Sequence, residues 1–297
     1  LSMLRDSEVL YERGVYPNST YIFKHALTRE VVYDSILTEK KKQIHAKIAH
    51  AVEEIYKENI CDCYGVLANH YMAGEDYERA AEYSRLEAKK YQKAASFRDA
   101  VEYAKRSIGC LEKLPQSEAV QKKIIDARTI LSIYYLSLNY HNEAKDAVEP
   151  VINLALDLNY TKRLPGLYTA MVEYHAAVEE DFSKAKQYLN EVSEIAAKAG
   201  DFLALWFANY QLGSVICMDY HFDESTACLK TTLDLSILSN NLVGITHPKS
   251  ALALSNNIQG KTDLAMQMST EALQAATESR DIIALHPANV SQGMSCY

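Results

Sequence analysis

A phosphate-binding loop is the first chemistry to test for, because Gly260, Lys261 and Thr262 stand in the order in which such loops end. In those loops a Gly-rich turn presents backbone N–H groups to the phosphates, while the Lys and Ser/Thr side chains bind phosphate and Mg²⁺. The upstream Gly of the motif is missing here. The string also falls at an expected turn between two helices, so we interpret it as an ordinary link.

Metal binding is the second chemistry to test. His45 and His50 are five residues apart on an expected helix, a spacing that places them on different faces. The cysteines lack the C-x₂-C spacing of a tetrahedral zinc site. They are Cys61, Cys63, Cys110, Cys217, Cys228 and Cys296. We interpret most of them as reduced, buried, small apolar side chains, and we expect no metal, no cofactor and no catalytic residue.

Composition and charge narrow the class of protein. The chain has 297 residues, so it needs two domains or an extended repeat architecture. The composition is 48% hydrophobic and 24% charged with only 10 Gly and 6 Pro, which is typical of a protein built from long helices. A net charge of -8 argues against nucleic-acid binding, which depends on Lys and Arg. No apolar run is long enough to span a bilayer, and we expect a cytoplasmic protein.

A repeated pair of residues is the strongest signal in the sequence. In six places an aromatic or polar residue is followed three positions later by a small residue, and the last three pairs are forty residues apart. The pairs are Tyr77/Ala80, Phe97/Ala100, His141/Ala144, Phe182/Ala185, Phe222/Ser225 and Thr262/Ala265. A second marker repeats at the same forty-residue interval. Its members are Asp201, Asn241 and Asp281, and each precedes a helical pattern. Two markers in phase predict an internal repeat of about 40 residues.

Each repeat is expected to hold two helices. Apolar and small side chains recur at steps of three and four, as in Ala185, Leu189 and Val192, which is typical of a helix with one buried face. The Asp and Asn markers suit helix N-caps, because their side chains can accept from free backbone N–H groups. Gly200 suits a left-handed C-cap.

The spacing predicts thirteen helices joined by short links. Their ranges are 38–58, 62–73, 76–94, 96–114, 117–138, 141–158, 160–178, 181–199, 201–219, 222–239, 241–259, 262–279 and 281 onward. Short links force neighbouring helices to be antiparallel, and stacked hairpins bury a continuous core. We therefore predict an all-α fold, a right-handed α-solenoid of helical hairpins. Pro248 and Pro287 fall inside two expected helices, where we expect a bend or a late start.

These hairpins resemble tetratricopeptide repeats. In that motif the first helix carries Leu-Gly or Leu-Ala and then an aromatic residue, and the second opens with aromatic-x-x-Ala. Leu67, Ala68, Tyr71, Tyr77 and Ala80 match it closely. The period departs from the usual thirty-four residues, which longer helices would account for. The resemblance implies that residues 37–297 are tetratricopeptide-like repeats, cut within the last repeat.

Residues 1–36 do not follow the repeat. Tyr21-Ile22-Phe23 predicts one short strand between a turn at Pro17-Asn18 and a helix that opens near Leu27. This segment, with Tyr33 after it, resembles the tail of the winged-helix region in STAND-type signalling ATPases, and particularly that of class III adenylyl and guanylyl cyclases with a repeat tail. The resemblance implies that residues 1–36 are a domain remnant and that the chain is a non-catalytic regulatory module of a larger ATPase or cyclase.

The first helices of tetratricopeptide units line a concave groove, and the resemblance places nine residues in it. They are Thr129, Ile133, Tyr174, Tyr210, Ser214, His247, Ser250, Leu254 and Asn257. Aromatic and polar side chains of this kind can bind a peptide or a helix. We expect the partner to be another protein, the upstream domain of the same chain or a small-molecule inducer, and neither nucleic acid nor membrane.

Three other functions stay open from the sequence. A free-standing adaptor would assemble complexes without an ATPase. A small-molecule receptor would close its superhelix around an inducer. A helical hydrolase or transferase would use His247 or His286 as a base, although no paired nucleophile supports this.

Overall fold

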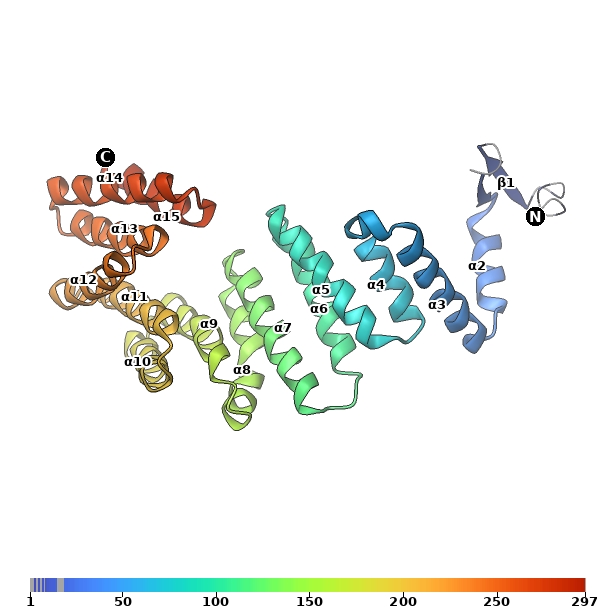
Figure 1. The fold of residues 1–297 in the computed structure, drawn as a ribbon, viewed down its shortest axis with the longest axis horizontal. Helices are drawn as coiled ribbons and strands as arrows, with labels where there is room; N and C mark the ends of the chain where they lie inside the picture. Colours follow the sequence, from blue (N-terminus) through green and yellow to red (C-terminus); the bar gives the residue numbers. More distant parts are fainter. Residues whose placement is uncertain (1–2, 4, 6, 8, 15–18, 297) are drawn as a thin grey trace. The chain divides into compact units, whose positions relative to one another are not determined.

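The computed structural model describes residues 3, 5, 7, 9–14 and 19–296, and these are helical apart from one small hairpin (Figure 1). The described part contains 14 α-helices, so the predicted all-α class is confirmed. The chain divides into two compact units, which are residues 1–90 with 106–114 and residues 91–105 with 115–297.

A two-stranded hairpin opens the first unit. β1 (Leu10–Arg13) pairs antiparallel with β2 (Thr20–Phe23), and Leu10 lies opposite Phe23. The predicted strand is confirmed as β2, whereas the prediction of a single strand in this piece is wrong. β1 has the sequence Leu-Tyr-Glu-Arg, which is half charged and too short to show a strand pattern. The predicted turn at Pro17-Asn18 lies outside the described residues.

The helices of the first unit follow the hairpin. They are α2 (Ala26–Ser35), α3 (Thr38–Ile55), a 3₁₀ segment (Lys57–Cys63), α4 (Tyr64–Ala73), α5 (Tyr77–Lys93) and the second half of α6 (Phe97–Leu111). Tyr71 is 1% exposed and belongs to the core, and its ring stacks on that of Tyr83 with 5.6 Å between centroids. α2 ends just before residues 36–37, and the domain boundary expected there stays a prediction.

The second unit is a run of antiparallel helices. After the first half of α6 come α7 (Glu118–Leu136), α8 (His141–Asp157), α9 (Leu164–Ala177), α10 (Phe182–Ala199), α11 (Phe202–Met218), α12 (Phe222–Leu238), α13 (Leu242–Ile258), α14 (Thr262–Ser279) and α15 (Ile282–Ser295). The late start expected at the prolines is wrong, because α13 begins at Leu242 and runs through Pro248, and α15 likewise contains Pro287. The burial expected for most cysteines is confirmed for Cys63, Cys110 and Cys217, whereas Cys228 is half-buried and Cys61 and Cys296 are exposed.

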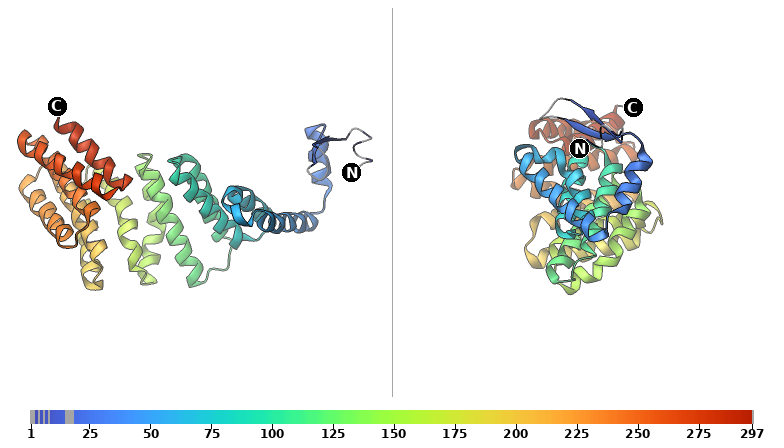
Figure 2. Two further views of the ribbon diagram at one scale, coloured as in Figure 1. Left: turned by 45° about the horizontal axis from the view of Figure 1, so that its top comes forward. Right: turned by 90° about the vertical axis from the view of Figure 1, so that its right-hand side faces the viewer.

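These helices form two layers within the second unit (Figure 2). Each helix from α7 to α15 packs on the next, and α7, α9, α11, α13 and α15 also contact one another in that order. We call these five the odd helices. No comparable contact joins one even helix to the next among the described residues. The odd helices therefore form a continuous layer of their own, as the first helices of a tetratricopeptide-like solenoid do.

The repeated residue pairs mark the contacts between helices. The aromatic or polar member is the first residue of α5, α6, α8, α10, α12 and α14. The small member three positions later is 0% exposed in all six helices. In Ser225, the one hydroxyl among the six, Oγ donates to the Gly213 carbonyl at 2.7 Å. A larger side chain would overfill these contacts, so the small residues are required by packing.

The links are as regular as the helices. From residue 180 to residue 280, every twentieth residue has a positive φ. These residues are Glu180, Gly200, Tyr220, Asn240, Gly260 and Arg280. The C-cap predicted at Gly200 is confirmed, as are the N-caps at Asp201 and Asn241, whose side chains each accept from a backbone N–H three residues on at 3.0 Å. One left-handed residue per link thus fixes the twenty-residue step.

We expect Gly260→Ala to lower the free energy of unfolding by about 1 kcal/mol and Arg280→Gly to raise it by a similar amount, because an L-residue with a Cβ is strained at positive φ. The φ values are +70° and +53°. A Cβ at Gly260 would have no heavy atom within 4 Å, so backbone strain alone is tested. Urea unfolding measures the free energy of unfolding of both variants. Changes of the same sign in the two variants would contradict the assigned backbone strain.

Candidate functional site

All nine residues predicted for the groove lie on odd helices. Thr129 and Ile133 are on α7, Tyr174 on α9, Tyr210 and Ser214 on α11, and His247, Ser250, Leu254 and Asn257 on α13. The repeat register thus assigns them to one layer of the second unit. The structure does not bring all nine together, however.

A cavity of about 360 Å³ opens on this layer, with walls from α9, α11, α13 and α15. We call it the groove pocket. Four of the predicted residues line it: Tyr210, Ser214, Ser250 and Leu254. Much of the remaining wall is apolar, including Val172, Val215, Met218, Pro287 and Val290. A volume above 300 Å³ with an apolar wall and a few polar groups is typical of ligand sites.

Two predicted residues lie next to the groove pocket without lining it. The His247 ring meets the Tyr210 ring edge-on at 5.6 Å between centroids, and its Nδ1 donates to the Val243 carbonyl at 2.9 Å. The Asn257 amide donates to Ser295 Oγ at 2.9 Å, which links α13 to α15. Both side chains hold the layer together, and His247 also fixes one wall of the pocket through Tyr210.

The other three predicted residues lie elsewhere on the layer. Thr129 is 3% exposed, and a Cβ added to Gly166 would lie 2.7 Å from its methyl group, so Thr129 packs α7 on α9. Ile133 is 45% exposed. Tyr174 is half-buried, with the Lys145 ammonium 4.7 Å from its ring centroid. Only Ile133 and Tyr174 present surface to a partner there.

Glu173 is a pocket residue that the sequence analysis did not single out. Among the described residues that line the groove pocket, it is the one Asp, Glu, Lys or Arg. Its carboxyl has neither a hydrogen bond nor an ion pair within the described part of the chain. Burial raises the pKa of Glu173, and the charge of His141 opposes this only in part.

Comparison of equivalent positions in the forty-residue repeats distinguishes Glu173 in the sequence. At steps of forty residues the same position holds Glu173, Gly213, Ala253 and Gly293. Gly213 is buried, and a Cβ there would lie 2.7 Å from Leu229 Cγ, so this is a position of close helix packing. A carboxyl therefore stands where the other repeats hold a small side chain, which is the local inconsistency expected at a functional site.

Two further polar groups converge on the groove pocket. Ser250 is 5% exposed, and its Oγ has no hydrogen-bond partner among the described residues. A buried hydroxyl left in this state costs about 1–3 kcal/mol. Burial raises the pKa of Tyr210, and the charge of Glu173 adds to this, so the phenol keeps its proton. The pocket thus offers unsatisfied hydrogen-bonding groups on an apolar wall.

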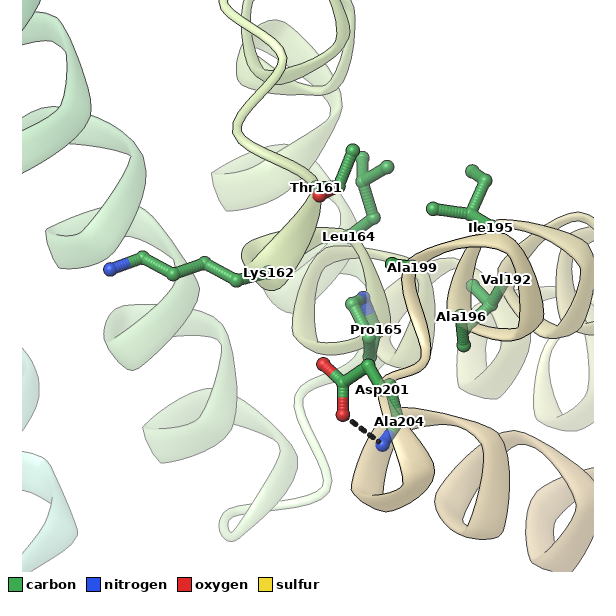
Figure 3. A pocket seen from close by; sticks show the side chains of 10 residues that line it. All are labelled: Thr161, Lys162, Leu164, Pro165, Val192, Ile195, Ala196, Ala199, Asp201 and Ala204. Carbon is green, nitrogen blue, oxygen red and sulfur yellow. Dashed lines mark hydrogen bonds between the residues drawn. The ribbon is translucent and has the colours of Figure 1, made fainter.

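Two cavities at the edge of the second unit are weaker candidates. One of about 210 Å³ lies between the starts of α9 and α11 and the end of α10 (Figure 3). The Lys162 side chain points away from it, and the Asp201 carboxylate is occupied by the Ala204 N–H at 3.0 Å. A cavity of about 490 Å³ occupies the same place one repeat later, beside Phe202 and Leu238. Neither contains an unpartnered charged group.

The other chemistries have no site in the described residues. Gly260 and Lys261 form the turn between α13 and α14, and Lys261 Nζ donates to Gln259 Oε1 at 2.6 Å, as suits an ordinary link. No three His, Cys, Asp or Glu side chains of the described part gather as metal ligands. None of its helices combines the length and the apolar character needed to span a membrane.

Comparison with known proteins shows the fold. No family model and no curated protein sequence matches the chain. The apo form of RapI matches with a TM-score of 0.61 at 14% identity, over 91% of this chain and 78% of that one. The repeats of a kinesin light chain from Podosopora anserina match with a TM-score of 0.51 at 15% identity, over 67% and 95%.

A third solved structure extends over the N-terminal piece. It is a signal transduction ATPase with numerous domains (STAND) from Pyrococcus horikoshii, which has a tetratricopeptide repeat sensor. The TM-score is 0.55 at 13% identity, and the match covers 99% of this chain but 48% of that protein. At such identities the likeness shows the fold alone. The chain has the fold of a tetratricopeptide-like α-solenoid.

We expect Glu173→Gln to raise the free energy of unfolding at pH 8 and to change it little at pH 4. A carboxyl whose pKa is raised by folding is fully compatible with the fold below its unfolded pKa, and stability is lost as the pH rises through the folded pKa. The exposed Asp234 of α12 gives the matched control Asp234→Asn, which should change neither value. Urea unfolding at several pH values measures the difference in free energy of unfolding between each variant and the natural chain. A gain in stability of Glu173→Gln that does not depend on pH would contradict the raised pKa of Glu173.

Proposed function

We propose that the chain is a non-catalytic interaction module that binds a segment of a partner protein in its groove pocket. The observation that carries this proposal is the pairing of an unpartnered carboxyl, Glu173, and an unpartnered hydroxyl, Ser250, in one apolar cavity. Groups of this kind are costly in the free protein, and a ligand that satisfies them gains affinity.

The rim of the groove pocket favours a peptide. Met218 is 56% exposed and Val290 46% exposed, although both line the pocket. Apolar side chains at the mouth of a cavity can hold an apolar anchor of a bound segment, while Tyr174 and Ile133 extend the same layer toward α7. The net charge of -8 supports a protein partner over nucleic acid.

A regulatory role in a larger signalling protein is the finer part of the proposal. It is supported by the likeness to the STAND protein, which extends over the β-hairpin and α2 as well as the repeats. α2 has no buried residue, and its Leu27 and Val31 are 74% and 68% exposed. These residues would pack on the rest of a preceding ATPase domain. The cyclase context rests on the sequence resemblance of the same segment, and a free-standing adaptor is the alternative.

A small-molecule inducer is a second candidate ligand. The specific observation in its favour is the volume of the groove pocket, about 360 Å³, which is enough for a compact ligand. A ligand of this kind would use the same carboxyl and hydroxyl as a peptide side chain. The two candidates therefore share one site.

Selection of a random twelve-residue peptide library on the immobilised chain tests the site. We expect selected peptides to lose at least about 30-fold in affinity on Leu254→Arg, which fills the pocket with a charged side chain. The matched control is Leu238→Arg on α12, a residue 84% exposed and outside the pocket, which should leave affinity unchanged. Peptides that bind both variants equally, or a library without binders, would contradict the proposed groove.

A further inference from the structure

We propose that the groove pocket recognises a basic side chain, Lys or Arg, next to an apolar residue of the bound segment, with the Glu173 carboxylate as its counter-charge. This inference rests on the proposed function and specifies its ligand.

Three other acids of the second unit have a cation from a neighbouring helix or turn. Lys186 contacts Asp219 at 2.7 Å, Lys249 contacts Glu271 at 2.7 Å, and Arg163 contacts Asp126 at 2.6 Å. All three carboxylates are more than a quarter exposed, so water also solvates them. Glu173 is likewise partly exposed, but it lines an apolar cavity and has no such cation. A carboxylate on an apolar wall is stabilised by a counter-charge, which a bound ligand can supply.

The surroundings of Glu173 suit a cation on an aliphatic stem. An ammonium has three N–H donors and a guanidinium five, so either needs acceptors beyond one carboxylate. The unpartnered Ser250 hydroxyl is such an acceptor, and Gln211, whose Oε1 accepts from Thr169 at 3.4 Å, lines the same pocket. The apolar wall can cover the methylene groups of a Lys or Arg stem.

An anionic ligand does not fit the same pocket. No Lys or Arg is among the described residues that line it, so a carboxylate or phosphate would bring a second negative charge beside Glu173. Like charges in an enclosed site repel strongly. A neutral ligand could accept a hydrogen bond from protonated Glu173, and the two cases differ in the sign of their pH dependence.

Binding of a cation favours the ionised form of Glu173. Affinity should therefore rise with pH until Glu173 of the free protein is ionised, and binding below that pH should release up to one proton. Glu173 interacts electrostatically with His141 of α8 and Tyr210 of α11, and His286 of α15 lines the same pocket. A protonated His286 would also repel a cation at low pH. The variant His286→Asn separates this effect from that of Glu173.

The probe is the twelve-residue library, followed by one selected peptide synthesised with Lys, Gln or Glu at its basic position. We expect the selected sequences to share a Lys or Arg beside an apolar residue. Replacing that Lys by Gln, or Glu173 by Gln, should each weaken binding by about 30-fold, the low end for removing one partner of a buried charge pair. The rise of affinity with pH should persist in His286→Asn and vanish in Glu173→Gln.

The outcomes separate this inference from the proposed function. Peptides that depend on Leu254 but lack a basic residue, or that bind Glu173→Gln unchanged, would overturn the inference and leave the groove intact. Affinity that falls as the pH rises would do the same, because it would indicate a ligand that accepts from protonated Glu173. Peptides that ignore Leu254→Arg would overturn the groove itself.

Discussion

The close approach of neighbouring helices at one small side chain is the contact on which this fold depends. In six helices the residue three positions after the first is fully buried and is Ala or Ser. The contact fixes the distance between neighbouring helices, and the left-handed residue in each link fixes the direction of return. Because the contact recurs every forty residues and the left-handed residue every twenty in the C-terminal part, the odd helices form a layer of their own. The groove pocket is a consequence of this layer.

Glu173 is where the packing rule and the local chemistry disagree. Its counterparts forty, eighty and one hundred and twenty residues later are the small residues Gly213, Ala253 and Gly293, of which Gly213 and Ala253 are buried in the helix packing. A carboxyl at this position costs stability, and nothing in the described structure neutralises it beyond the partial effect of His141. Stability given up at one position without a packing benefit is typical of a functional site.

Much of the fold could be predicted from the sequence because its signals are local. Helix periodicity, the N-caps at Asp201 and Asn241 and the C-cap at Gly200 each depend on residues within one turn. Tyr220 and Arg280 gave no such signal, although they have the same left-handed backbone, because neither residue type favours a positive φ. β1 was hidden for a related reason, since its half-charged sequence is a strand only through pairing with β2.

The site was less predictable than the fold, because it depends on side chains from helices forty residues apart. The repeat pattern placed nine residues on the right layer, but how deeply each is buried depends on its neighbours. Gly166 leaves room for Thr129 to be buried, and Tyr210 and Ser250 line one pocket from two different helices. The sequence alone shows that Glu173 is a charged residue at a repeat position where later repeats have Gly or Ala. Its missing partner could be recognised only in three dimensions.

The central claim is that the odd helices present the binding surface, and methyl NMR spectroscopy of the chain titrated with a selected peptide tests it most directly. The account predicts shifts of the methyl signals of Val172, Met218 and Leu254, which line the groove pocket, while those of Leu203 and Leu238 at the edge cavity stay in place. Shifts confined to Leu203 and Leu238 would contradict it and move the site to the edge.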